Sequence, residues 1–241
     1  MQVKVTLSYD GSQFNGYQMQ NSGVKTVANK LDKILKSLKI DTKIHASGRT
    51  DTGVHATNQV IHFEIPEFWN DLKKLKYMLN QKSLPDIYIK EIKVVDETFH
   101  ARYSAKRRVY RYLISTKVPS VFLAPYILFV PTIDERSIEE AIKYFEGEHD
   151  FEYFKKSKGS QKQSRRIIYK ARFYKHKEFY VFSFEANGYL RSQIRMMVHF
   201  LLEISDKRLT VDALKEQLTL VKRHSTGVVV PNGLYLSRIK Y

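Results

Sequence analysis

The sequence predicts an α+β fold built on a largely antiparallel sheet. Short segments alternate apolar and polar residues, which is typical of half-buried strands. Stripes of apolar residues at helical spacing lie between them. A turn at His176-Lys177 separates two such strand segments, which indicates a hairpin. Strands in hairpins with helices between them are typical of α+β domains, and a chain of 241 residues that is 43% hydrophobic can bury a core.

In the first half, residues 3–9 alternate as a strand and residues 10–23 read as a turn-rich loop. Apolar residues from Val24 to Leu38 recur at helical spacing and predict an amphipathic helix. The remaining elements are expected in this order: a short strand near 43–45, a polar loop, a strand over 59–65, a helix near 70–79 and a strand over 86–95.

The second half is expected to repeat this theme. A strand over 108–115 and a loop with three prolines precede a helix marked by Ile138 and Phe145. The later elements are a hairpin of 166–175 with 178–185, helical stripes over 190–201 and 211–221, and a strand over 233–239. Because no low-complexity linker separates the halves, we place the boundary near residue 104, which gives domains 1–104 and 105–241.

The chain is strongly basic, with 41 Lys and Arg against 25 Asp and Glu and a net charge of +16. Such a charge attracts polyanions, of which nucleic acid is the commonest. Plain solubility of a lysine-rich surface is a competing explanation for part of this charge.

Several classes of chemistry are disfavoured. There are no cysteines, so disulfides, thiolate nucleophiles and cysteine-bound zinc are excluded. Neither GxxxxGK[ST] nor GxGxxG occurs, so we expect no nucleotide cofactor. His45, His55 and His62 match no common metal-ligand spacing, so they are expected to be satisfied or surface histidines, with no metal. The N-terminus shows no signal sequence and no apolar run reaches ~20 residues, so we expect a cytoplasmic protein without a membrane partner.

The most unusual segment is the loop HASGRTDTGVHA (45–56), in which glycines flank Arg49, Thr50 and Asp51. Glycines allow a tight turn close to a ligand. A carboxylate repels phosphates, so Asp51 in an RNA-binding loop points to catalysis. The alternative, that Asp51 caps a turn or pairs with Arg49, is what most loop aspartates do and is favoured by the spacing alone.

Basic segments suggest how RNA could be bound. The segment FHARYSAKRRVYRYLI (99–114) interleaves basic and aromatic residues, which suits phosphate contacts and base stacking. On a strand, Tyr110 and Tyr112 share one face, and for Tyr112 a place in the core is an equally good interpretation. Arg191 and Arg195 lie four apart on an expected helix, either as an anion-binding face or as its solvent side. The loop 155–166 holds six basic residues and no acid, and faces either RNA or solvent.

Together these motifs resemble one family, the TruA-type tRNA pseudouridine synthases. The similarity spans nearly the whole chain and is most specific in GRTDTGVHA. The motifs, in the order of the family, are YDGSQFNGYQMQ (9–20), GRTDTGVHA (48–56), FHARYSAKRRVYRYLI (99–114), GEHDFEYF (147–154), ANGYLRSQIRMMV (186–198) and PNGLYL (231–236). Departures are Tyr17, where the family often has Trp, and the individual sequence of the 155–166 loop.

The resemblance implies a cofactor-free isomerase that converts uridine to pseudouridine at positions 38, 39 and 40 of the tRNA anticodon stem-loop after flipping the base out. Asp51 matches the family's nucleophile and Arg195 an arginine that pairs with it. Arg49 matches an arginine that fills the space of the flipped uridine, and Tyr110 a tyrosine that stacks on it. Further RNA contacts are expected from the basic segments, at Arg107, Arg108, Arg165, Arg166 and Arg191.

The fold implied by the resemblance consists of two ferredoxin-like (RRM-like) halves that share a long, mainly antiparallel sheet with a basic central cleft. Family members are homodimers that bind tRNA across both subunits. Two other functions are compared with this one: a non-catalytic RNA-binding or RNA chaperone protein, which should tolerate Asp51→Asn, and a metal-dependent nuclease, which needs clustered acids or histidines that the sequence spacing does not indicate.

Overall fold

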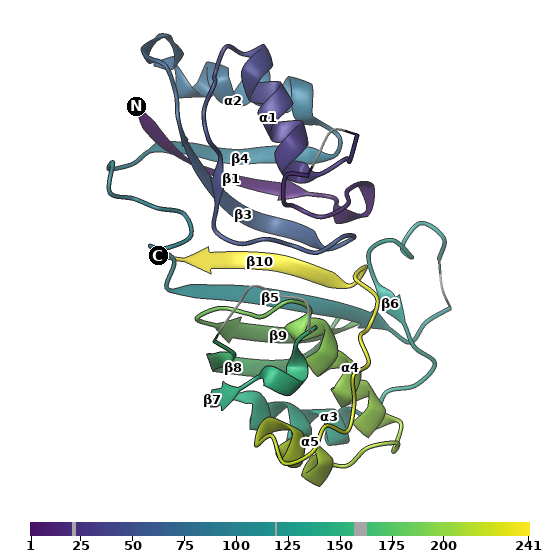
Figure 1. The fold of residues 1–241 in the computed structure, drawn as a ribbon. Helices are drawn as coiled ribbons and strands as arrows, with labels where there is room; N and C mark the ends of the chain where they lie inside the picture. The colour runs from purple at the N-terminus through teal and green to yellow at the C-terminus, as the bar shows by residue number, and fades with distance from the viewer. Residues whose placement is uncertain (21–22, 119, 157–162) are drawn as a thin grey trace. The chain divides into compact units, whose positions relative to one another are not determined.

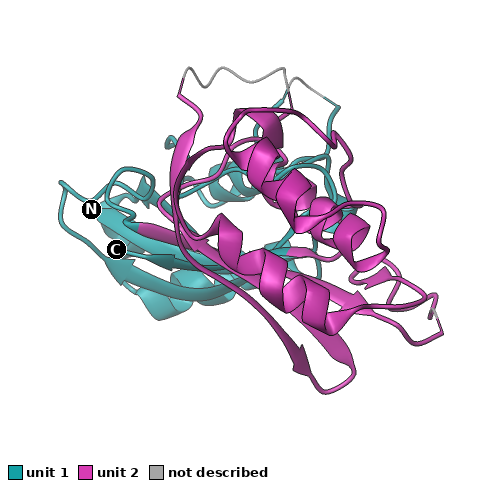
Figure 2. Cartoon of the chain, turned by 90° about the horizontal axis from the view of Figure 1, so that it is seen from below, with its two compact units in different colours: residues 1–106, 235–241 teal, residues 107–234 magenta. Residues whose placement is uncertain are grey.

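The computed structural model describes residues 1–20, 23–118, 120–156 and 163–241. The chain forms two compact units, which Figure 2 shows in different colours: unit 1 contains residues 1–106 and 235–241, and unit 2 contains residues 107–234. Each unit combines a sheet with helices (Figure 1), so the α+β prediction is confirmed. Within the described residues, no helix has the length and apolar character needed to cross a membrane.

Unit 1 is built on an antiparallel sheet in the order β4-β1-β3, and β2 pairs with the other edge of β3. The same edge of β3 also pairs in parallel with β10, where His55 lies opposite Tyr235. The α-helices and strands are β1 (Gln2–Tyr9), α1 (Val27–Ser37), β2 (His45–Ala46), β3 (His55–Glu64), α2 (Leu72–Ser83), β4 (Ile87–Val94) and β10 (Leu234–Lys240).

Local sequence explains most of unit 1. In β1, Val3, Val5 and Leu7 are fully buried and alternate with more exposed residues, so one face of the sheet carries the core, over which α1 and α2 lie (Figure 1). Helix α1 begins at Val27, later than the apolar spacing suggests, because the Thr26 side chain caps it by accepting a hydrogen bond from the Asn29 amide.

Unit 2 has an antiparallel sheet in the order β5-β9-β8-β7. The expected hairpin is present as β8 and β9, and Lys177 in its turn adopts a left-handed backbone with φ of 53°. The elements are β5 (Arg107–Ser115), β6 (Leu128–Phe129), α3 (Glu135–Ala141), a 3₁₀ turn (Ile142–Phe145), β7 (Gly147–Asp150), β8 (Arg165–His176), β9 (Phe179–Ala186), α4 (Gln193–Ser205) and α5 (Val211–Leu218).

An aromatic cluster forms the core of unit 2. The ring of Phe154 lies 5.5 Å from that of Phe145 and 5.8 Å from that of Phe200, and all three side chains are fully buried. Phe184 on β9 contacts Phe145 at 6.3 Å. The cluster therefore joins the sheet to α4 and to the turns around β7.

The C-terminal strand belongs to unit 1, whereas the sequence-based division into 1–104 and 105–241 keeps it with the second half. The difference arises because β10 pairs with β3, and partners this far apart in sequence leave no local pattern. The short strands β6 and β7 were not predicted either, since two to four residues show no periodicity.

Candidate functional site

The loop that carries Asp51 connects β2 to β3 and is anchored where it begins. The buried Ser47 donates its amide to the carbonyl of Val60 at 2.8 Å and its hydroxyl to Gln59 Oε1 at 2.6 Å. The Gln59 amide in turn donates to the carbonyl of Gly48 at 3.0 Å. Since Ser47 and Gln59 are both nearly inaccessible to solvent, these bonds hold the start of the loop firmly against β3.

The middle of the loop is held through Thr50. The Thr50 hydroxyl lies 2.8 Å from the Tyr9 hydroxyl, and its carbonyl accepts a hydrogen bond from the Tyr17 amide at 3.1 Å. One residue on, the carbonyl of Asp51 accepts from the Val54 amide at 3.1 Å, which closes a turn through Gly53 at φ of +76°. Hydrogen bonds therefore hold Thr50 before Asp51 and the turn from Asp51 to Val54 after it. The predicted tight turn is confirmed.

Segment 10–17 packs against the loop too closely for ordinary side chains. A Cβ on Gly11 would lie 2.1 Å from the carbonyl oxygen of Val54. Gly16 has φ of +89°, and a Cβ there would lie 3.1 Å from the carbonyl oxygen of Thr50. The two glycines of the YDGSQFNGYQMQ motif thus let one backbone segment support the other.

On this fixed backbone the side chains alternate in exposure. Arg49 is exposed, Thr50 is buried and Asp51 is half-buried. The buried Thr50 anchors the loop, while the guanidinium and the carboxylate on either side can reach a ligand. The loop therefore presents one cation and one carboxylate from a rigid support.

His55, at the start of β3, has a structural role. Its Nδ1 accepts a hydrogen bond from the Gly11 amide at 3.0 Å and lies 3.3 Å from an Asp10 carboxylate oxygen. Its ring stacks on Tyr235 at 4.8 Å. The expectation that His55 is a satisfied histidine is confirmed.

Tyr17 supplies the first testable prediction. Its hydroxyl is the one buried side-chain polar atom without a hydrogen-bond partner among the described residues, and burial raises its pKa. An unpaired buried hydroxyl costs about 1–3 kcal/mol, so Tyr17→Phe should leave the free energy of unfolding unchanged or raise it. Chemical denaturation measures this, and a loss of more than about 1 kcal/mol would show that the hydroxyl has a partner.

In unit 2, the aromatic residues of β5 alternate as predicted. Tyr110 and Tyr112 are buried and Arg111 is exposed. Tyr112 belongs to the core, where its hydroxyl donates to the carbonyl of Val230 at 2.7 Å and burial raises its pKa. Tyr110 keeps 9% of its surface exposed, and its ring meets that of Tyr189 edge to face at 5.2 Å. Of the two tyrosines, Tyr110 is therefore the better placed to meet a ligand.

Arg195 lies in the first turn of α4, and its Nε donates to the carbonyl of Val229 at 2.7 Å. Arg191 has an exposed side chain but precedes the helix, which begins at Gln193 after Ser192 adopts a left-handed φ of 60°. The expectation that Arg191 and Arg195 share one stripe of a helix is therefore wrong. The prediction from apolar spacing alone placed the start of this helix too early in the sequence.

The remaining arginines expected to contact RNA differ in what they bind within unit 2. Arg107 pairs with the buried Glu185 at 2.9 Å and lies 4.3 Å from the ring centre of Tyr169. Arg108 donates to the carbonyl of Asn187 at 2.8 Å, and Arg166 to that of Gln163 at 3.0 Å.

Arg165 is 68% exposed and lies 4.0 Å from Glu148. Half of the basic loop 155–166, namely residues 157–162, lies outside the described residues.

Asp51 and Arg49 thus belong to unit 1, whereas Tyr110 and Arg195 belong to unit 2. The pairing of Asp51 with Arg195 stays a prediction.

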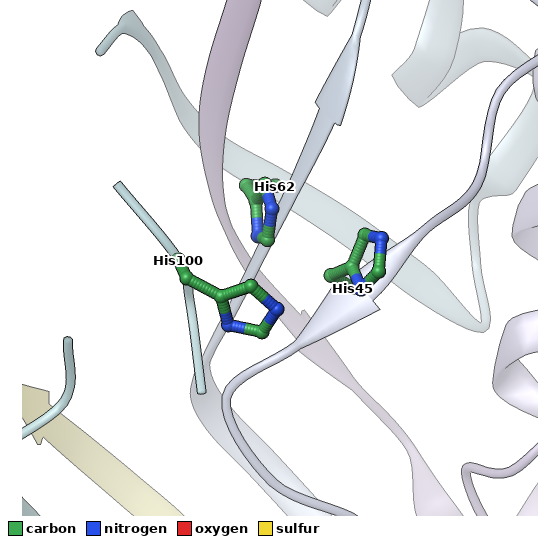
Figure 3. A group of neighbouring side chains, drawn as sticks. All are labelled: His45, His62 and His100. Carbon is green, nitrogen blue, oxygen red and sulfur yellow. The ribbon is translucent and has the colours of Figure 1, made fainter. Parts of the chain in front are cut away.

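A cluster of histidines in unit 1 corrects the interpretation from spacing. His45, His62 and His100 each place a ring nitrogen within 4.8 Å of those of the other two (Figure 3). His45 and His62 meet because they lie opposite each other in the β2–β3 ladder, and His100 comes from the segment after β4. The expectation that the histidines do not cluster is therefore wrong, and it failed because strand register is not visible in sequence spacing.

The hydrogen bonds of this cluster do not suit a metal ion. Nδ1 of His62 accepts from the Ala101 amide at 3.1 Å, and Nδ1 of His100 accepts from the amides of Arg102 and Tyr103. An accepting nitrogen carries no proton, so in the neutral rings the proton sits on Nε2, where a metal would need a lone pair. The rings of His45 and His62 also stack at 18°, so their in-plane lone pairs do not converge.

The charge state agrees with this assignment. Burial, together with His45 and His100, lowers the pKa of His62 to about 4, and burial also lowers the pKa of His45. His45 and His62 are therefore neutral at physiological pH. His62 and His100 act as hydrogen-bond acceptors for the segment after β4.

Comparison with known proteins gives consistent results. A family model described as "tRNA pseudouridine synthase" matches residues 6–104 and 141–241. Three proteins named "tRNA pseudouridine synthase A" are similar over nearly the full length. The protein of Helicobacter hepaticus is 37% identical, and the match covers 99% of this chain and 98% of the relative. The protein of Wolinella succinogenes is 40% identical, with 98% of this chain and 92% of the relative covered. The protein of Campylobacter jejuni is 39% identical, with 100% of both chains covered.

Proposed function

Since the chain belongs to the tRNA pseudouridine synthase family, we propose that it modifies uridines 38, 39 and 40 of the tRNA anticodon stem-loop and that Asp51 is its nucleophile. The general reaction, isomerisation of uridine in tRNA, follows from the family. The target positions rest on the resemblance of the motifs to TruA-type enzymes. The role of Asp51 rests on that resemblance and on the rigid loop that presents its carboxylate.

The loop geometry is the observation that carries the assignment. A nucleophile must meet the reacting carbon at a defined position, and the hydrogen bonds at Thr50 and Val54 fix the backbone on both sides of Asp51. A carboxylate can add to an electrophilic carbon of the nucleoside and leave again. A loop that merely carried a solvated charge would need no such support.

The chemistry balances without a cofactor. The bond between N1 of uracil and C1′ of ribose breaks, the base rotates, and a bond between C5 and C1′ forms. C5 loses its proton and N1 gains one, so the product is an isomer of the substrate. No electrons are exchanged with a second reactant, which agrees with the absence of nucleotide-binding motifs in the sequence.

Tyr110 is proposed to stack on the target base and Arg195 to pair with Asp51. The edge-to-face contact with Tyr189 supports Tyr110 in this role because it fixes the ring plane. A guanidinium beside the carboxylate would hold it ionised and oriented.

Arg165 and Arg191 are proposed to meet phosphates with their exposed side chains. Arg107, Arg108 and Arg166, which also make contacts within unit 2, contribute positive charge.

Arg49 is proposed to fill the space of the flipped uridine, since it is exposed and its neighbour Thr50 is anchored. Extracting a stacked base costs a few kcal/mol, so Arg49→Ala should lower kcat about 10- to 100-fold and change the Kd for tRNA about threefold or less. Single-turnover assays and filter binding measure the two. On a transcript whose target uridine is already unpaired, the kcat defect should shrink; a defect of the same size there would contradict the role.

The ferredoxin-like fold is proposed for both units. In unit 1 the antiparallel order β4-β1-β3-β2, with α1 and α2 as the connections, supports it. A cytoplasmic homodimer that binds tRNA across both subunits is proposed from the resemblance alone, and the mass of the enzyme in solution checks the dimer.

Pseudouridine mapping tests the proposal. Unmodified tRNA transcripts are incubated with the wild type and with Asp51→Ala, and every uridine is scored. We expect pseudouridine at positions 38, 39 and 40 with the wild type and at none with the variant. Product at other positions would overturn the target assignment, and product with the variant would overturn the nucleophile.

A further inference from the structure

The segment after β4 forms a turn, residues 99–104, that is held by hydrogen bonds from several elements. Its ends are joined by two bonds between His100 and Ser104, at 3.0 and 2.9 Å. Gln2 on β1 donates to the carbonyl of Phe99 at 2.8 Å. The hydroxyl of Tyr241 at the C-terminus donates to the carbonyl of Ala101 at 3.0 Å. The turn is thus ordered before any ligand arrives.

The histidine cluster fixes the tip of this turn. Nδ1 of His62 accepts from the amide of Ala101, and Nδ1 of His100 accepts from the next two amides, those of Arg102 and Tyr103, at 3.2 and 3.3 Å. Three successive backbone amides therefore donate to the ring nitrogens of two histidines. Figure 3 shows the ring of His100 close to those of His62 and His45.

The turn lies on the face of the unit 1 sheet away from its helices. Lys4 pairs with His62 in the antiparallel β1–β3 ladder, so their side chains share a face. Val3 and Val5 alternate with Lys4 and point to the opposite face, which α1 and α2 cover. The Lys4 ammonium lies 5.6 Å from the ring centre of Phe99, which places the start of the turn on the same side as His62.

Tyr103 projects from this turn with 77% of its surface exposed. Its ring packs on that of His100, with centroids 4.4 Å apart and planes at 32°. The guanidinium of Arg102 lies 5.6 Å from its centre. One side of the tyrosine ring is thus supported, while most of its surface remains open to solvent.

We propose that Tyr103 is a stacking platform for an unpaired nucleobase of the bound tRNA, outside the Asp51 loop. Stacking on an aromatic side chain is a common means by which proteins hold a single-stranded base. Because His100 already holds the ring, little side-chain entropy is lost when a base stacks on it. The net charge of +16 attracts RNA to the protein, and Lys4 and Arg102 place two cations beside this turn. The inference rests on tRNA being the substrate and not on Asp51 being the nucleophile.

Binding of unmodified tRNA to the full-length protein tests the proposal. Tyr103→Ala should weaken binding about 5- to 150-fold, which corresponds to the loss of about 1–3 kcal/mol when a stacked aromatic ring is removed. Tyr103→Phe and Tyr103→Trp should stay within about threefold of the wild type, since each keeps an aromatic face. The slope of log Kd against log salt should be the same for Tyr103→Ala and the wild type, because stacking releases no counterions.

Tyr77 on α2 offers a matched control, since it is a tyrosine in the same unit with 62% of its surface exposed. Tyr77→Ala should bind tRNA like the wild type. Wild-type affinity of Tyr103→Ala, or an equal loss in Tyr103→Phe, would overturn the proposal. So would a Tyr103→Ala variant whose mass in solution differs from that of the wild type, because Tyr103 would then contact a second protein chain. Thermal melts verify that each variant is folded.

Discussion

Asp51→Asn should abolish pseudouridine formation and leave tRNA binding intact. An amide cannot add to the nucleoside as a carboxylate does, so kcat should fall by a factor on the order of 10⁴ or more. The affinity for tRNA should be unchanged or slightly higher, since one charge that repels phosphates is removed. Release of tritium from C5-labelled uridine in tRNA measures turnover, and filter binding measures affinity.

The variant is well matched to the wild type. Asparagine has the shape of aspartate, and the hydrogen bonds that hold the loop come from Thr50, Val54 and the backbone of Asp51, none of which the substitution alters. Asp32→Asn on α1 is the control for the loss of one negative charge, because this carboxylate pairs only with Lys36 among the ion pairs of the described residues. It should retain full turnover.

The same experiment separates catalysis from a purely RNA-binding role. A non-catalytic RNA chaperone would show no turnover in the wild type and no penalty in Asp51→Asn. Turnover of Asp51→Asn within tenfold of the wild type would remove Asp51 from the chemistry. Loss of tRNA binding in this variant would instead assign it to recognition.

Features encoded by neighbouring residues were predictable from the sequence. The alternation of Val3, Val5 and Leu7 predicted β1, and the turn at His176-Lys177 predicted the β8–β9 hairpin. Glycines around Asp51 predicted the tight turn that Val54 closes. In each of these cases the deciding residues lie within a few positions of one another, where periodicity and turn preferences operate.

Features that depend on strand register were not predictable. His45 and His62 meet through the pairing of β2 with β3, and Tyr235 meets His55 through the parallel pairing of β10. The ion pair between Arg107 and Glu185 likewise joins two strands distant in sequence. Spacing along the chain contains no information on which residues of different strands lie opposite each other.

The start of helix α4, next to Arg191, also could not be predicted from the sequence. Arg191 fits the apolar and basic spacing of the following helix, but the left-handed backbone at Ser192 ends the helical run before it. A left-handed serine is uncommon, and nothing in its neighbours signals it. The position of Arg191 therefore had to come from the structure.

Gly11→Ala should push the Asp51 loop away from segment 10–17, which packs against it, and should destabilise the whole protein. The new Cβ would lie 2.1 Å from the oxygen and 2.3 Å from the carbon of the Val54 carbonyl, and 2.9 Å from the His55 nitrogen. These are backbone atoms, so no change of rotamer can relieve the clash. Overpacking of this kind costs typically 1–3 kcal/mol and occasionally more. Because the clash is with backbone atoms, we expect the upper end, about 3 kcal/mol of unfolding free energy.

Turnover should fall as well, because the clash displaces Val54, the residue whose amide closes the turn after Asp51. The Val54 amide donates to the Asp51 carbonyl, and the Gly11 amide donates to His55. If the two backbones move apart, both bonds lengthen and the carboxylate loses its fixed position. Residual kcat measured below the melting temperature should therefore be lower than that of the wild type, even where the variant is fully folded.

Gly48→Ala is the matched control for stability. Gly48 belongs to the same loop, yet a Cβ there meets no atom within 4 Å and its φ lies outside the left-handed region. Its unfolding free energy should stay within about 0.5 kcal/mol of the wild type. If Gly11→Ala proved as stable as Gly48→Ala, the close approach of segment 10–17 to the loop would be wrong. The loop would then owe its shape to its own hydrogen bonds, and the fixed position of Asp51 would not depend on Gly11.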